Sequence, residues 1–310
     1  MDYLKISIVT PSFNQADFLE ETITSIIDQH YPNLEYIIID GGSSDRSVDI
    51  IKKYQRYLTY WVSEEDGGIG YALNKGFTMS TGEIMGWINS DDKMTPFSLH
   101  AIAQVFSEFS NVDWIQGSNA FWNSRGQLLK SKTNTINAID WLQGNSRWIQ
   151  QESTFWRRKL WEKAGSHIAN KIIMVDSELW SRFFANSELF YLQCILSGYR
   201  VHGINRAKIF SELCYQETKQ AEIQLSQLAD PSITNLANKI KSHLKIFSFF
   251  LANSKNHKLL KTLCFLTFGQ IFKNTYARAG YNVISWDFSL NRWILARFSF
   301  GDPKISRFID

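Results

Sequence analysis

The chain has 310 residues, of which 44% are hydrophobic and 20% are charged, and its formal net charge is +3. This composition is that of a globular protein with a sizeable core, and it excludes a disordered or collagen-like chain. No run of about 18 uninterrupted apolar residues occurs, and the first residues lack the basic region of a signal peptide, so we expect a cytoplasmic protein without a transmembrane helix.

Strands and helices are expected to alternate through the first third of the chain. The β-branched run at 6–10 stops at Pro11 and predicts a buried strand, and the apolar spacing at 17–29 predicts a helix. The same patterns predict strands at 34–39, 58–63 and 83–88, and helices at 45–57, 69–79 and 96–109. This alternation indicates a Rossmann-like, mostly parallel sheet flanked by helices on both faces.

The pattern becomes mixed beyond Val112. Short strands are expected at 113–117 and 153–156, and a helix at 176–185. Further helices are expected near 217–229, 232–252 and 256–274. We therefore predict an α/β domain at residues 1–215 and a basic, aromatic-rich helical extension at residues 216–310.

Four polar clusters each follow a predicted strand. They are the segments 11–14, 40–45, 64–68 and 89–92. Because ligands of open parallel sheets bind outside the carboxyl ends of the strands, we expect these clusters to line one edge of the sheet.

Asp91 and Asp92 are adjacent acids at the end of a predicted strand. Carboxylate oxygens are the ligands that magnesium and manganese prefer, and such a cation offsets the charge of a diphosphate leaving group. The alternative is structural, with Asp92 or Thr95 capping the helix that follows Pro96. The proximity of the other polar strand ends favours the metal site.

Two glycine-rich segments also follow strands. In the first, the 40–45 segment, we expect Asp40 to bind a base or ribose and Asp45 to cap the following helix, although a purely structural turn would also fit. In the second, Asp66-Gly67-Gly68 opens a helix whose start is a natural anion site, with Asn74 and Lys75 within it. A structural turn is the alternative here as well.

Asp176 follows the apolar run 172–175 and precedes a helix. An isolated aspartate at such a position is more often a helix N-cap than a catalytic group.

The motifs occur in a set order along the chain, which is Ser7-Ile8-Val9-Thr10-Pro11-Ser12-Phe13-Asn14, Asp40-Gly41-Gly42-Ser43-Ser44-Asp45, Gly68 to Gly76, Thr81-Gly82-Glu83-Ile84 and Asn89-Ser90-Asp91-Asp92. This ordered set resembles the family 2 inverting glycosyltransferases, which have the GT-A fold. The resemblance covers about residues 1–210.

The resemblance implies roles for individual residues. Asp176 would be the catalytic base, and Asp91 and Asp92 would hold a divalent metal, Mn²⁺ or Mg²⁺. The nucleotide-sugar pocket would be formed by Pro11, Ser12, Asn14, Asp40, Gly42, Ser43, Asp66, Asn74, Lys75, Ser90 and Asp91. The acceptor side would contain Gln151, Glu152 and Trp180.

The activity that the resemblance implies is transfer of a sugar from a nucleoside-diphosphate donor, with a UDP-sugar favoured. The acceptor would be a hydroxyl of a glycan or of a lipid-linked molecule, in bacterial surface polysaccharide synthesis. The sequence departs from the family pattern at Asn89, where an Asp is frequent, and at Gly70-Tyr71, where Tyr-Asp is frequent. A non-catalytic sugar-nucleotide or membrane-binding protein and a nucleotidyltransferase remain alternatives.

The C-terminal residues 231–310 contain 12 Lys and Arg but only 3 Asp and Glu, whereas residues 1–230 contain 21 and 27. Lysines interleaved with Phe and Leu suit a helix on an anionic membrane, which would place the protein on the inner face of the cell membrane. They equally suit a helical cap on the catalytic domain. Nucleic acid is not an expected partner, because the catalytic part is acidic.

Overall fold

The computed structural model describes residues 3–144, 148–170, 173–203, 205–252 and 280–298. The predicted helix at 256–274 lies outside these residues, as do the side chains of 243–252. A nine-stranded sheet is the centre of the molecule, with strand order β13-β12-β10-β6-β9-β4-β1-β2-β3.

The N-terminal half of this sheet follows the predicted alternation. Its parallel strands are β1 (Ile6–Ser12), β2 (Leu34–Asp40), β3 (Tyr60–Ser63) and β4 (Ile84–Trp87). The helices between and after them are α1 (Ala16–Ile27), α2 (Ser47–Tyr54), α3 (Ile69–Met79) and α4 (Ser98–Glu108), with a short 3₁₀ turn at Gln55–Tyr57. The Rossmann-like fold class is therefore confirmed.

The other half of the sheet is mixed. Strand β9 (Thr154–Arg157) is antiparallel to both of its neighbours, β4 and β6 (Trp114–Gln116). Beyond β6, strand β10 (Phe190–Leu192) is parallel to β6, and β12 (Tyr281–Asp287) is parallel to β10. Strand β13 (Arg292–Phe298) closes this edge as an antiparallel hairpin with β12.

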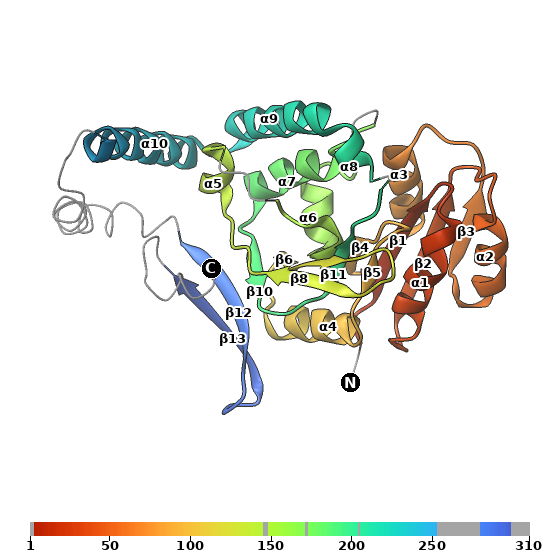
Figure 1. Ribbon diagram of the computed structural model, residues 1–310. Coiled ribbons are helices and arrows are strands. Elements are labelled where there is room, and N and C mark those ends of the chain that lie inside the picture. The colour runs from red at the N-terminus through yellow and green to blue at the C-terminus, as the bar shows by residue number, and fades with distance from the viewer. Residues whose placement is uncertain (1–2, 145–147, 171–172, 204, 253–279, 299–310) are drawn as a thin grey trace.

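Alternate side chains of the strands enter two hydrophobic cores, one on each face of the sheet. Ile8 and Ile38 belong to the core beneath α1, α2 and α4, whereas Val9 and Ile37 belong to the core on the opposite face. The second core is covered by α3, α6 (Arg158–Lys163), α7 (Val175–Asn186) and α9 (Ser211–Leu228) (Figure 1). Tryptophans dominate it, because Trp87, Trp114, Trp156 and Trp180 are all buried there.

A second sheet has four strands, in the order β5-β11-β7-β8. Its strands are β5 (Lys93–Met94), β7 (Asn119–Trp122), β8 (Leu128–Lys132) and β11 (Ser197–Arg200). Three short helical segments complete the main body: α5 (Ala138–Leu142), the 3₁₀ turn Gln151–Ser153 and α8 (Arg206–Ile209).

The C-terminal extension is not helical throughout. Helices α9 and α10 (Pro231–Ala252) lie along the top of the molecule in Figure 1, but the β12–β13 hairpin joins the main sheet. The hairpin was missing from the sequence prediction. The predicted boundary between residues 215 and 216 falls inside α9, which packs along α7, so the two-domain division stays a prediction.

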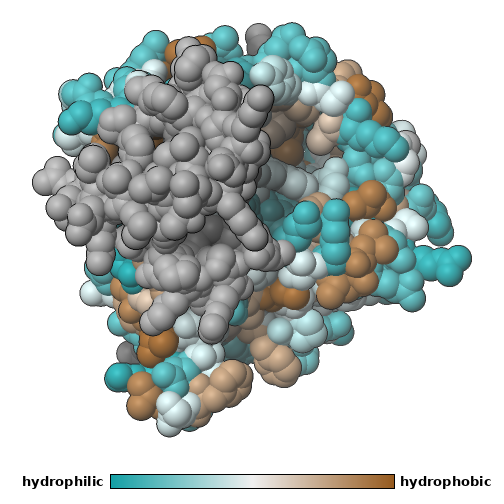
Figure 2. Space-filling model, turned by 60° about the vertical axis from the view of Figure 1, so that its left-hand side comes forward, coloured by the Kyte–Doolittle hydropathy of each residue, from teal (hydrophilic) through white to brown (hydrophobic). Residues whose placement is uncertain are grey.

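No helix among the described residues is long and apolar enough to span a membrane. On the face shown in Figure 2, outside the grey residues, hydrophobic side chains form separate patches among hydrophilic ones.

Candidate active site

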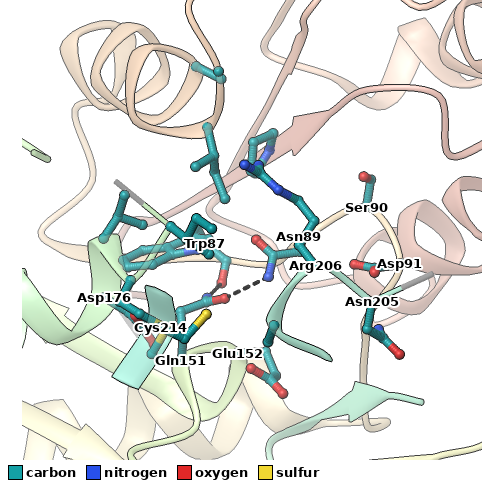
Figure 3. Close-up of a pocket in the computed structure, with 18 of the residues that line it drawn as sticks. Trp87, Asn89, Ser90, Asp91, Gln151, Glu152, Asp176, Asn205, Arg206 and Cys214 are labelled. Carbon is teal, nitrogen blue, oxygen red and sulfur yellow. Dashed lines mark hydrogen bonds between the residues drawn. The ribbon is translucent and has the colours of Figure 1, made fainter. Parts of the chain in front are cut away.

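A pocket of about 1040 Å³ opens at the carboxyl ends of β1, β2 and β4. Three of the four predicted polar clusters contribute to it through Pro11, Ser12, Gly41, Gly42, Asn89, Ser90 and Asp91, and the fourth contributes Asp66 and Gly68. The expectation that these strand-end segments share one edge of the sheet is thus met. Asp176, Gln151 and Glu152 line the same pocket (Figure 3), as does Trp180.

The loop after β2 is held in shape by Asp40. Its carboxylate accepts hydrogen bonds from Ser43 N at 2.9 Å, Ser43 Oγ at 2.6 Å and Ser63 Oγ at 2.7 Å, and Asp40 is fully buried. The pocket wall here is the backbone of Gly41 and Gly42. A base contact by Asp40 stays a prediction, since its oxygens organise the loop in this structure.

Asp45 has the capping function expected of it. It accepts hydrogen bonds from Ala16 N at 2.9 Å and Ser47 N at 2.9 Å, and so satisfies free N–H groups at the starts of α1 and α2. These contacts lower the pKa of Asp45, against the opposing effect of burial.

Five predicted binding residues do not line the pocket: Asp40 and Ser43 of the loop after β2, and Asn14, Asn74 and Lys75. Asn14, at a positive φ of 51°, hydrogen-bonds to the 43–44 turn. Asn74 clamps the 168–170 loop through Ile168 N and Ile168 O, and Lys75 pairs with Glu64 on the surface. Their contact with a donor stays a prediction, and each has a structural partner here.

The helix start at Gly68 is shaped by its glycines. Gly68 has a φ of 104°, and a Cβ on Gly70 would lie 2.6 Å from the carbonyl oxygen of Ala169. The Gly70-Tyr71 departure from the family pattern therefore accompanies a close approach of the 168–170 loop. Asp66 stabilises the turn by accepting a hydrogen bond from Gly68 N at 2.7 Å.

The two adjacent aspartates have different surroundings. Asp91 lines the pocket, and its Oδ2 accepts a hydrogen bond from His202 Nε2 at 2.9 Å. Asp92 is buried, and its oxygens accept hydrogen bonds from Arg200 N at 2.7 Å and Asn89 Nδ2 at 3.3 Å. Burial and the negative charges of Glu152 and Asp91 raise the pKa of Asp92 well above its usual range.

Neither aspartate caps the helix that follows. The side chain of Gln29 takes this role, accepting from Leu99 N at 2.8 Å and from the Ser98 hydroxyl at 3.2 Å. The hydroxyl of Thr95 instead donates to Ile195 O. The cap interpretation of Asp92 and Thr95 is therefore wrong. Asp91 was not part of that interpretation, and it lines the pocket.

Arg200 holds the Asp91–Asp92 loop in place. It is fully buried, donates through Nε to the Asp91 carbonyl at 2.5 Å, and pairs with Glu21 at 2.8 Å. Its guanidinium lies over the ring of Phe18, which in turn stacks on His202 at 4.8 Å between centroids. The arginine thus fixes both members of the Asp91–His202 pair.

Asn89 is held by the acceptor-side residue Gln151. Gln151 Oε1 accepts from Asn89 Nδ2 at 3.1 Å, and Gln151 Nε2 donates to Trp87 O at 2.5 Å (Figure 3). The Asn89 Oδ1 atom is buried without a hydrogen-bond partner among the described residues. Three further atoms of pocket-lining residues are also buried without a hydrogen-bond partner among the described residues, namely Ser12 Oγ, Glu152 Oε1 and Trp180 Nε1. Such unsatisfied groups are expected where a polar ligand completes a site.

Asp176 lies in the first turn of α7 rather than at its cap. The N–H groups of Ile173 and Met174 before the helix are taken by Glu217 Oε2, each at 2.8 Å. Asp176 accepts from Ser177 N at 2.8 Å and faces the pocket beside Trp87 and Gln151 (Figure 3). Burial raises the pKa of Asp176 to about 6, with a smaller contribution from Glu217.

Glu152 is a second perturbed carboxyl group. It is 1% exposed, and burial together with the charges of Asp176 and Asp91 raises its pKa to about 8. A buried carboxyl group of this kind takes up a proton more readily than usual, and in its protonated form it is able to donate a hydrogen bond.

Sequence reasoning missed several residues at the site. His202, Asn205, Arg206 and Tyr199 come from β11 and the segment after it, and all but His202 line the pocket. His202 follows the short strand 197–200. A polar residue at the end of this strand, as at the ends of the other strands, was the signal that could have identified it. The strand itself was not predicted, because its partners are far away in sequence.

Comparison with known proteins agrees with this geometry. The model of Glycosyl transferase family 2 matches residues 7–177. An uncharacterized glycosyltransferase of Nostoc sp. is 26% identical over 244 residues, which is 72% of this chain and 73% of the relative.

Two solved structures have similar folds. TarS of S. aureus in complex with UDP-GlcNAc superposes with a TM-score of 0.61 at 14% identity, over 76% of this chain and 70% of that one. The mannosyltransferase PcManGT from Pyrobaculum calidifontis, in complex with GDP-Man and Mn²⁺, gives 0.51 at 17% identity over 84% of both chains. With the family model spanning more than half of its length, the chain belongs to glycosyl transferase family 2.

Proposed function

We propose that this protein transfers a sugar from a nucleoside-diphosphate donor, with a UDP-sugar favoured, to a hydroxyl of a glycan or lipid-linked acceptor, with inversion, in bacterial surface polysaccharide synthesis. The observation that supports it is the presence of Asp91, the glycine-lined loops and Asp176 in one pocket. Its volume of about 1040 Å³ is at the upper end of ligand sites, so it has room for both substrates.

The donor would lie on the side of the pocket formed by β1, β2 and β4. Gly41 and Gly42 let a base or ribose approach the backbone closely, and the start of α3 at Gly68 offers N–H groups to an anion. Arg206 and Lys208 also line the pocket and add positive charge to it. UDP-GlcNAc in TarS and GDP-Man in PcManGT make a sugar nucleotide the favoured class, without choosing the base.

A divalent cation fits part of the predicted site. Asp91 lines the pocket and His202 lies behind it, and the hydrogen bond of 2.9 Å between Asp91 Oδ2 and His202 Nε2 would be replaced by contacts to the cation, for which a carboxylate oxygen and an imidazole nitrogen are suitable ligands. Asp92 fits less well, since both of its oxygens already accept hydrogen bonds. The described residues contain no group of three or more such side chains, so the diphosphate would complete the coordination. When bound, the cation would offset the leaving-group charge.

Asp176 is proposed as the general base. It removes the proton from the acceptor hydroxyl, whose oxygen forms a bond to the anomeric carbon while the bond to the diphosphate oxygen breaks. Attack from the face opposite the leaving group inverts the configuration. A positioned base of this kind contributes roughly 10²–10⁴-fold to the rate.

The direct test is thermal stabilisation of the full chain by UDP, GDP, ADP and CDP, with and without manganese. Because a ligand at about 100-fold excess over its Kd stabilises by roughly 2.7 kcal/mol, a specific site gives a clear shift. We expect one nucleotide to stabilise in a manganese-dependent way, and Asp91→Asn and His202→Ala to remove the manganese dependence. His30→Asn, at an exposed histidine outside the pocket, is the matched control.

A family-typical donor site would be refuted if none of the four nucleotides stabilised the wild-type protein. If stabilisation occurred but was equal with and without manganese, the donor assignment would stand and the Asp91–His202 metal site would fail.

A further inference from the structure

One tryptophan is exposed at the rim of the pocket. All eleven tryptophans of the chain lie in its described part, and only Trp148 among them counts as exposed, at 37%. An aromatic side chain of this size normally buries most of its surface, so an exposed one beside a pocket points to a binding role.

The exposed ring is held firmly. The Trp148 carbonyl accepts hydrogen bonds from Asn119 Nδ2 at 3.0 Å and Asn134 Nδ2 at 2.7 Å, and both asparagines are buried. The ring meets Tyr199 edge-on at 5.0 Å between centroids and Phe121 at 5.8 Å. Because backbone and ring are both fixed, little conformational freedom would be lost when a ligand binds.

The small sheet extends this aromatic surface away from the pocket. Tyr199 of β11 is the register partner of Phe121 of β7, and Phe121 is the partner of Lys130 of β8. Directly opposed residues in a sheet point to the same face, so the three side chains form one row. At about 4.8 Å between strands, the row spans roughly 10 Å, close to the length of two sugar rings.

The outer end of the row is positively charged. Lys130 is exposed and lies over the Phe121 ring at 4.6 Å, and Lys132 lies on the same face of β8 because side chains alternate along a strand. Neither lysine pairs with an acid among the described residues, and β8 is the outer strand of its sheet. Both charges are therefore available to a ligand.

We propose that Trp148, Tyr199 and Phe121 form a stacking platform for the sugar rings of an acceptor glycan, which leads from the catalytic pocket to Lys130 and Lys132 and so favours a chain with carboxylate or phosphate groups. Trp148 and Tyr199 line the pocket that contains Asp176, so a chain on this platform would end near the base. The proposal rests on the proposed function, and it selects a glycan over the lipid part of a lipid-linked acceptor. Flat apolar faces of sugar rings suit aromatic side chains, whereas a lipid chain would need a continuous apolar groove.

The test measures binding of neutral hexose oligosaccharides and oligogalacturonates, two to four sugars long, to the full chain by saturation-transfer NMR and titration. We expect binding to strengthen from two to three sugars and to be stronger for the oligogalacturonates. Trp148→Ala should weaken binding about tenfold, which is 1.4 kcal/mol. Trp148→Phe should retain most of it, and Lys130→Ala should remove the preference for the charged series. Phe288→Ala, at a 90% exposed phenylalanine on the β12–β13 turn, is the matched aromatic control.

Nucleotide binding is measured on the same variants to separate the two proposals. Equal saccharide binding by wild type and Trp148→Ala would overturn the platform, as would nucleotide binding with no saccharide bound at all. Saccharide binding that depends on Trp148 without any nucleotide binding would keep the platform and refute the donor site. Absence of both would refute both.

Discussion

At the scale of single residues, the environment of each carboxyl group decides its use. Asp45, Asp40, Asp92 and Asp176 all follow or precede strands and helices in similar sequence contexts, yet one caps two helices, two organise loops, and one faces the pocket. The sequence predicted that acids would gather at this edge of the sheet. It could not assign their roles, because these depend on which groups the fold brings to each carboxylate, and for Asp92 the partner is Arg200, 108 residues away.

Asp176→Asn tests the base directly. The change keeps the size and the hydrogen bond from Ser177 N but removes the ability to take a proton, so kcat should fall by about 10²–10⁴-fold. Donor binding, measured by nucleotide stabilisation, should remain. A parallel loss of nucleotide binding would show that Asp176 belongs to the donor site instead.

The pH dependence follows from the same group. Because burial raises the pKa of Asp176 to about 6 in the unliganded protein and the base must be ionised, kcat/KM should be half-maximal near pH 6 and fall about tenfold per unit below it. Asp176→Glu, which retains a carboxyl group, should still lose activity as the pH falls, with the midpoint at a different pH. A rate that is flat between pH 5 and 7 in the wild type would contradict the assignment.

At the scale of secondary-structure elements, Glu35 joins three segments. This 3% exposed carboxylate of β2 accepts hydrogen bonds from Ser7 Oγ of β1 and from Thr81 N in the turn before β4, and it pairs with Lys5. Its pKa is lowered to about 2, as these contacts outweigh the opposing effect of burial.

Glu35→Gln should therefore destabilise the protein by about 2 kcal/mol at neutral pH, after allowance for the partial exposure of Lys5. The folded-state pKa is depressed, so the contribution of Glu35 is complete above the unfolded pKa near 4.3 and is lost as pH falls toward 2. Urea unfolding of both proteins at pH 7 and pH 3 measures this. Glu108→Gln, an exposed helix-end carboxylate, is the control, and an equal gap at both pH values would contradict the prediction.

The elements that sequence patterns predicted well are those made of local contacts. Helix α3 begins and ends where its apolar spacing indicated, at Ile69 and Met79. The β12–β13 hairpin was missed although its two strands pair with each other locally, and only its place beside β10, some 90 residues earlier, depends on a distant contact. The same holds for β11, which carries Tyr199 and precedes His202.

At the scale of the whole molecule, the hairpin connects the C-terminal region to the main core. Ile284 and Trp293 pack in the same hydrophobic core as α1, α2 and α4, and Arg297 pairs with Glu188 next to β10. The basic charge of residues 231–310 and its attraction to an anionic membrane stay predictions.

Trp293→Ala tests whether the predicted boundary at residue 215 separates independent units. Because Trp293 is 9% exposed within the shared core, its truncation should cost about 3–5 kcal/mol and lower a single, cooperative unfolding transition. Calorimetry distinguishes this single transition from two separate transitions, of which only one would shift in temperature. Two transitions would support an independent C-terminal domain.

The two faces of strand β11 have different neighbours. Arg200 points to the Asp91 loop, and Tyr199, one residue before it, points to the opposite face and the Trp148 ring. Under the two proposals, the residue that holds the Asp91 loop and a residue of the acceptor platform are adjacent in one strand, whereas the rest of the aromatic row belongs to the β7–β8 hairpin. If both proposals hold, exchange of that hairpin between relatives would be a modular route to new acceptors, one that changes which chain is extended and leaves the sugar that is added unchanged.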